Sequence, residues 1–154
     1  MHATAKAEGR EVCAEDLMSS PVVAVTTGHN LAAAWEAMRE RRVHHLVVLE
    51  GHRLAGVLDD RTIAARWPAG GPEVVYSTRV GDLVSRGAWS VLPDEPASAV
   101  ARVMTEAHCD AVPVVTAAGV LLGLVTATDL VAAVARGAVP VAADAESSGH
   151  DDRD

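Results

Sequence analysis

Apolar residues in the first half of the chain occur in short runs and in one stretch with helical spacing. The helical stretch is marked by Leu31, Ala34 and Met38, and Asn30 before it is a favourable N-cap. The pattern predicts a helical turn at 15–18, a strand at 22–25, a helix at 31–42, strands at 45–49 and 54–58 joined by a turn at Gly51, and a helix at 60–67.

The second half predicts the same order of elements. They are a helical turn at 80–84, a strand at 90–92, a helix at 96–107, strands at 112–116 and 120–125, and a helix at 127–136. Residues 46–49 match 112–115 at an offset of 66, and residues 54–58 match 121–125 at an offset of 67. An internal repeat of this kind sets the architecture before any single residue does.

Each copy therefore predicts a β-α-β-β-α repeat, and the fold class is α/β (α+β). Each small sheet leaves an apolar face that needs cover, and the other copy can provide it. We expect two repeats packed as one pseudo-twofold module with two equivalent clefts.

Composition suggests where this module begins and ends. We expect a flexible arm at 1–10, the first repeat at 11–67, a linker rich in Pro and Gly at 68–79, the second repeat at 80–137, and a disordered acidic tail at 138–154.

Charge and composition narrow the possible partners. Hydrophobic residues make up 49% of the chain but aromatic residues only 3%, so Val, Leu and Ala must build the core. A net charge of -8 argues against nucleic-acid and membrane partners. The two cysteines form no disulfide framework, and no apolar run has the length of a signal peptide or membrane span. We therefore expect a soluble, cytoplasmic protein.

The repeated motifs resemble a tandem CBS-domain pair, also called a Bateman module. The resemblance covers about residues 12–136. It rests on Asp16-Leu17-Met18-Ser19, Pro21-Val22 and Gly56-Val57-Leu58 in the first copy, and on Asp82-Leu83, 111–115 and 123–130 in the second. It implies a non-catalytic regulatory sensor that needs no cofactor and binds AMP, ADP or ATP between its halves. It also implies a homodimer that acts on a protein target, which the sequence does not identify. S-adenosylmethionine remains open as a ligand.

Thr126 and Asp129 are the candidate ligand contacts, because they follow a strand and open a helix. A helix N-terminus favours phosphate, and a carboxylate accepts hydrogen bonds from both ribose hydroxyls. The family pattern adds a platform for the adenine, at Trp89, Ser90, Val91, Ala111, Val112 and Pro113. The same Thr-x-x-Asp spacing also forms a helix capping box, which needs no ligand.

The first copy has a different residue at each of these positions. Asp59 replaces Thr126 and Thr62 replaces Asp129, so a carboxylate would face the phosphate and none would remain for the ribose. We therefore expect one nucleotide cleft per chain, in the second repeat, with Arg61 as a weak candidate for an anion contact in the other.

Other functions remain open on the sequence alone. No catalytic motif is present. The alternative is a structural or protein-interaction scaffold without a ligand, which could dimerise through a metal. The candidate ligands for such a shared metal site are His44, His45, His108 and Cys109, although no standard metal-ligand spacing occurs.

Overall fold

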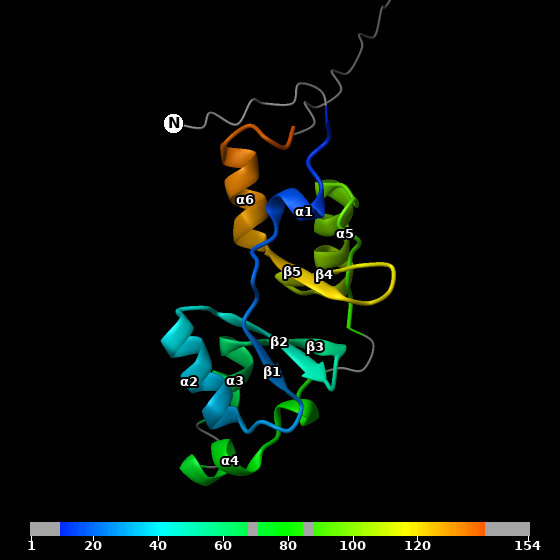
Figure 1. The fold of residues 1–154 in the computed structure, drawn as a ribbon. Helices are drawn as coiled ribbons and strands as arrows, with labels where there is room; N and C mark the ends of the chain where they lie inside the picture. Colours follow the sequence, from blue (N-terminus) through cyan, green and yellow to red (C-terminus); the bar gives the residue numbers. More distant parts are fainter. Residues whose placement is uncertain (1–9, 68–70, 85–87, 141–154) are drawn as a thin grey trace, which may run out of the picture.

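The computed structural model describes residues 10–67, 71–84 and 88–140. The expected arm and acidic tail lie almost wholly outside these residues, as does the start of the expected linker. Along the chain the elements are α1 (Ala14–Leu17), β1 (Ala24–Thr26), α2 (Leu31–Arg41), β2 (His45–Glu50), β3 (Arg53–Asp59), α3 (Asp60–Arg66), α4 (Pro72–Ser77), the 3-10 turn η1 (Val80–Asp82), α5 (Ala97–Ala107), β4 (Ala111–Val115), β5 (Leu121–Thr126) and α6 (Ala127–Ala135). They form two lobes stacked one above the other (Figure 1).

The first lobe, the lower one in Figure 1, contains a three-stranded sheet in the order β1-β2-β3. Strand β1 runs parallel to β2, and β2 pairs with β3 in a hairpin. Helix α2 begins where expected, because the Asn30 side chain accepts a hydrogen bond from Ala33 N at 2.9 Å. Its buried residues Leu31, Ala34 and Met38 pack into the core of this lobe.

The second lobe has only the β4-β5 hairpin as a sheet. The strand expected at 90–92 is reduced to a single parallel bridge between Val91 and Val114. Val91 N donates to Pro113 O at 3.0 Å and Val91 O accepts from Val115 N at 2.9 Å. Pairing ends there because the next donors on either side would be Pro93 and Pro113, which have no N–H group. The second copy thus keeps the order of the repeat with its first strand nearly lost.

Each lobe also includes a segment from the other side of the sequence. Helix α1 precedes the first repeat's sheet, yet Ala14 and Leu17 lie in the core of the second lobe. The turn η1 begins the second repeat, yet its Val80 is fully buried in the first lobe. Helix α4 falls in the segment expected to be a linker, and its Val75 is also fully buried there. Figure 1 shows α1 beside α5 and α6, and α4 below α2. The lobes therefore do not coincide with the sequence repeats.

A third apolar cluster joins the lobes. Val47 from the first sheet packs there with Ala111 and Leu124 from the second. Ser19 and Leu124 also exchange backbone hydrogen bonds, at 2.9 and 3.2 Å. This cluster packs the two halves against each other, and the structure confirms the α/β pseudo-twofold fold predicted from the repeat.

Candidate functional site

A cavity of about 310 Å³ lies between the lobes at the beginning of α6, and we call it the first cleft. The second half contributes Leu124, Thr126, Thr128 and Asp129 to its lining. The first half contributes two segments, Ser19 with Pro21–Val23 and then Val43–His45. Its volume lies at the lower end of the range for small-molecule sites.

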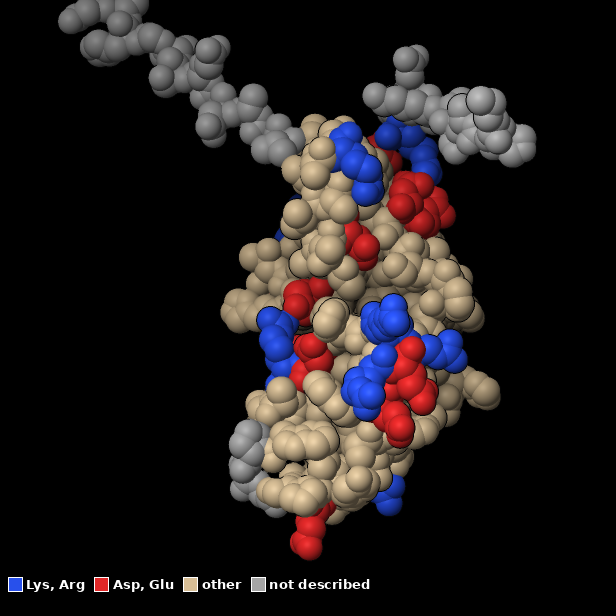
Figure 2. Space-filling model, turned by 90° about the vertical axis from the view of Figure 1, so that its left-hand side faces the viewer, with Lys and Arg blue, Asp and Glu red and all other residues tan. Residues whose placement is uncertain are grey.

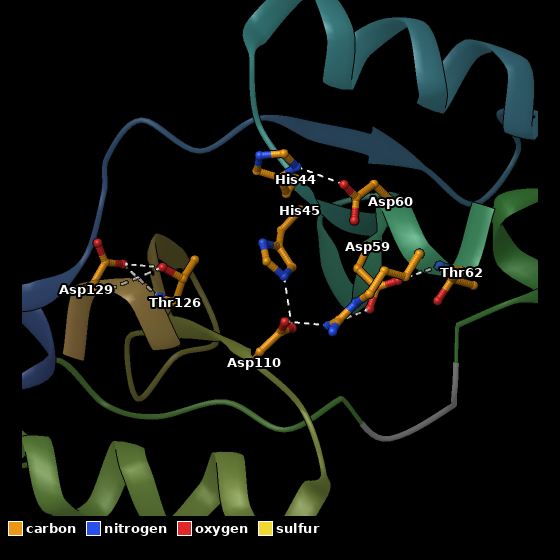
Figure 3. Close-up of polar contacts among 9 residues, drawn as sticks. His44, His45, Asp59, Asp60, Thr62, Asp110, Thr126 and Asp129 are labelled. Atoms are coloured by element: carbon orange, nitrogen blue, oxygen red, sulfur yellow. Dashed lines mark hydrogen bonds and ion pairs between the residues drawn. The ribbon is translucent and has the colours of Figure 1, made fainter. Parts of the chain in front are cut away.

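Thr126 and Asp129 form a capping box at the beginning of α6 (Figure 3). Asp129 Oδ2 accepts hydrogen bonds from Thr126 N at 2.7 Å and from Thr126 Oγ1 at 3.0 Å. Asp129 N donates in return to Thr126 Oγ1 at 3.4 Å. The other carboxylate oxygen, Oδ1, accepts no hydrogen bond from any residue that the structure describes. Capping therefore uses one oxygen and leaves the second available on the cavity wall.

Charged side chains link the two lobes beside this cleft. His45 Nε2 lies 2.9 Å from Asp110 Oδ1, and Arg61 also forms an ion pair with Asp110. Arg61 lies 3.6 Å from Asp59 as well. Burial alone would raise the pKa of Asp110. The hydrogen bond from His45 and the charges of His45 and Arg61 outweigh burial, so the pKa of this carboxyl lies below its ordinary value.

The structure does not bring the expected adenine platform to Thr126 and Asp129. Trp89, Ala111 and Pro113 line a different cavity of about 450 Å³, which we call the second cleft. The side chains of Val91 and Val112 are buried in the core, and Ser90 is exposed and lines neither cavity.

The cavity wall beside Asp129 comes from the first copy instead. Val23, Val43 and His45 of the first cleft are the repeat equivalents of Trp89, Cys109 and Ala111. The residues predicted for the adenine platform therefore occupy the corresponding positions of the other copy. The packing of the two repeats sets the beginning of α6 against the segment that leads into β1 of the first repeat. That arrangement is a property of the packing between the repeats, which the sequence of each repeat does not state.

The candidate metal ligands do not gather at one point. His44 lies 2.8 Å from Asp60, His45 pairs with Asp110, and His108 Nδ1 donates to the carbonyl of Thr105 at 2.8 Å. Among residues 10–67, 71–84 and 88–140 no group of three His, Cys, Asp or Glu side chains is placed to hold a metal ion. Within the same residues, no helix has both the length and the apolar character that crossing a membrane requires.

Comparison with known proteins decides the family. The CBS domain matches twice, at residues 14–67 and 80–136. The chain belongs to the CBS-domain family. This CBS-domain pair is 28% identical over 117 residues to the A-adding tRNA nucleotidyltransferase of Geobacter sulfurreducens. The match covers 76% of this chain but spans only 13% of that relative's length.

Two solved structures show the same CBS-pair architecture. Hypoxic Response Protein I, solved with two coordinated zinc ions, is 28% identical with a TM-score of 0.68, over 79% of this chain and 98% of that one. CBSX2, solved in complex with AMP, is 25% identical with a TM-score of 0.68, over 80% of this chain and 96% of that one.

Proposed function

We propose that this CBS-domain pair is a non-catalytic regulatory module that binds an adenosine-containing ligand in the first cleft. The observation that carries the proposal is that only one of the two carboxylate oxygens of Asp129 accepts hydrogen bonds. One oxygen caps α6, and the other lies on the wall of a cavity between the lobes with no partner among the described residues. A ribose hydroxyl is a suitable donor for that oxygen. The AMP complex of CBSX2, a similar protein, supports the choice of an adenine nucleotide.

The remaining walls of the first cleft suit the other parts of such a ligand. Val22, Val23 and Val43 supply an apolar surface for an adenine ring. The phosphate would lie toward Thr128 at the beginning of α6, where the helix dipole favours an anion. Binding between the lobes would favour one relative arrangement of the halves, and a partner protein would respond to that arrangement.

Isothermal titration calorimetry of the full chain with AMP, ADP, ATP and S-adenosylmethionine tests the proposal. The informative variant is Asp129→Asn, because its amide oxygen can still accept from Thr126 N while its NH₂ group offers a donor to the ribose. We expect saturable binding by the wild type and about ten- to hundredfold weaker binding by the variant, as for loss of a hydrogen bond to a charged group.

Asp16→Asn is the matched control. Asp16 accepts from Cys13 N at 2.9 Å at the beginning of α1, so it is also an N3 carboxylate, but it lies outside the first cleft. The control should bind like the wild type. If no nucleotide binds at millimolar concentration, the cleft is not a nucleotide site. The Thr126–Asp129 pair is then a purely structural cap, and the second candidate function, a protein-interaction scaffold, is favoured.

We also propose that the module forms a homodimer through its helical side. Figure 2 views the side on which α2 and α6 lie, and a broad area of its lower lobe carries no Lys, Arg, Asp or Glu. Val131 and Val134 of α6 are 67% and 41% exposed, and Trp67, after α3, is 43% exposed. Sedimentation of the wild type and of Val131→Glu tests this surface. The variant should be monomeric, and dissociation by EDTA alone would point to a metal-linked dimer.

A further inference from the structure

His45 lies on the wall of the first cleft, and only one of its two ring nitrogens has a partner. Its side chain is 15% exposed, and Nε2 lies 2.9 Å from Asp110 Oδ1 on the other lobe. Among residues 10–67, 71–84 and 88–140, Nδ1 has no hydrogen-bond partner, and no unpaired side-chain nitrogen or oxygen there is fully buried. Nδ1 is therefore accessible, and the cavity that His45 lines is the first cleft. Figure 3 shows His45 on one lobe and the Thr126–Asp129 pair on the other.

Asp110 determines which nitrogen of His45 carries the proton. An ionised carboxylate accepts hydrogen bonds and cannot donate one. Asp110 is ionised at neutral pH, since its pKa is lowered from the ordinary value of 3.8 despite its partial burial, and its second oxygen pairs with Arg61. The hydrogen atom between His45 and Asp110 must therefore belong to Nε2. A neutral His45 ring then has a lone pair on Nδ1, which is a hydrogen-bond acceptor on the cleft wall.

The first cleft thus has one acceptor from each lobe that has no partner among the described residues. One is Nδ1 of His45, and the other is Oδ1 of Asp129. A ligand that fills the cleft removes water from both atoms, so each needs a donor from the ligand to avoid the cost of an unpaired polar group. The apolar wall suited to an adenine ring includes Val43, which precedes His45 by two positions. A donor at the edge of the ring would suit Nδ1.

We propose that His45 Nδ1 accepts a hydrogen bond from the 6-amino group of the bound base, so that the first cleft selects 6-aminopurines over purines without that group. This inference deepens the proposed function and rests on it for the placement of the ribose at Asp129 and of the base against Val43. His45 is then a specificity-determining residue. Asp110 is a positioning residue, because it acts only by keeping the proton of His45 on Nε2.

Titration of the full chain with adenosine and with purine riboside, followed by calorimetry at mildly alkaline pH, tests the inference. Purine riboside has a hydrogen atom in place of the 6-amino group, and AMP is the third probe. The variant His45→Gln keeps an N–H group that can donate to Asp110 and removes the acceptor at Nδ1. The matched control is His52→Gln, an exposed histidine in the β2–β3 turn that does not line the first cleft. NMR of the ring nitrogens of His45 shows which one carries the proton, with no ligand needed.

We expect the wild type and His52→Gln to bind adenosine about tenfold more tightly than purine riboside, and His45→Gln to bind the two nucleosides equally. The free wild type should carry its ring proton on Nε2, and the Nδ1 signal should shift when adenosine binds. Equal binding of the two nucleosides by the wild type, or a proton on Nδ1, overturns the inference even if His45→Gln does not fold. Loss of AMP binding in His45→Gln with adenosine binding kept also overturns it, since His45 would then contact the phosphate. In these cases the proposed function stands, whereas a wild type that binds neither adenosine nor AMP overturns both.

Discussion

Gly123 in β5 lies beneath the segment that crosses from α1 into the first sheet. A Cβ atom at this position would lie 2.5 Å from Met18 Sδ and 2.9 Å from Met18 Cβ. The Met18 backbone has little room to move, since Met18 N donates to Ala14 O at 2.9 Å and Ser19 N donates to Leu124 O at 2.9 Å. We therefore expect Gly123→Ala to overpack this crossing.

The cost follows from two opposing effects. Overpacking of this kind costs about 1–3 kcal/mol. Alanine restricts the unfolded chain, which offsets about 0.4–1 kcal/mol where the backbone angles suit it. The net loss in free energy of unfolding is then roughly 1–2 kcal/mol, and the melting temperature should fall by roughly 2–8 °C for a chain of this length.

Thermal and urea unfolding, followed by circular dichroism, measure this loss. Gly28→Ala is the control, because the nearest side-chain atom to a Cβ there is Thr26 Oγ1, at an ordinary 3.8 Å. Gly123→Ala should also weaken AMP binding, since the displaced segment leads into Pro21–Val23 of the first cleft. A Gly123→Ala protein as stable as the wild type would refute the reasoning, and so would an equal loss in Gly28→Ala.

Three further predictions concern caps, charge and the joint between the lobes. Asn30→Ala should cost about 1 kcal/mol in chemical unfolding, because it removes the acceptor for Ala33 N. Leu124→Ala should cost about 2–5 kcal/mol and weaken AMP binding, because Leu124 lies in the shared core and on the first cleft. Asp110→Asn should cost at most about 1 kcal/mol, as expected for a partly exposed pair. Because the pKa of Asp110 is lowered in the folded state, the contribution of this ion pair to stability is fully present above the ordinary pKa of 3.8. Urea unfolding at decreasing pH should show that the contribution is lost as the pH falls further.

The repeat and the helical spacing predicted most of the fold because both depend on local sequence. The Asn30 cap, the hairpin at Gly51 and the first residue of α6 are where the sequence placed them. The sequence does not predict helix α4, because a segment bounded by Pro68 and Pro72 and rich in glycine is typical of a linker. Proline at the first helical position favours a helix start, and the burial of Val75 then stabilises that helix through a contact far along the chain.

The candidate site was predicted only in part. Thr126 and Asp129 carry their own local signal, and the structure places both on the first cleft. The residues on the opposite wall of the first cleft depend on how the two repeats pack against each other, and a single sequence does not state that packing. The ion pairs of Asp110 were also missed, because His45 and Asp110 are 65 positions apart and no periodicity connects them.

The exchange of α1 and η1 between the lobes affects how the two copies can evolve. A gene fragment encoding one copy alone would yield half of each crevice and neither of them whole. A later substitution in one copy alters a pocket whose opposite wall is encoded by the other copy. The two copies of this duplication are thus bound to evolve as a single unit, even while their pockets diverge.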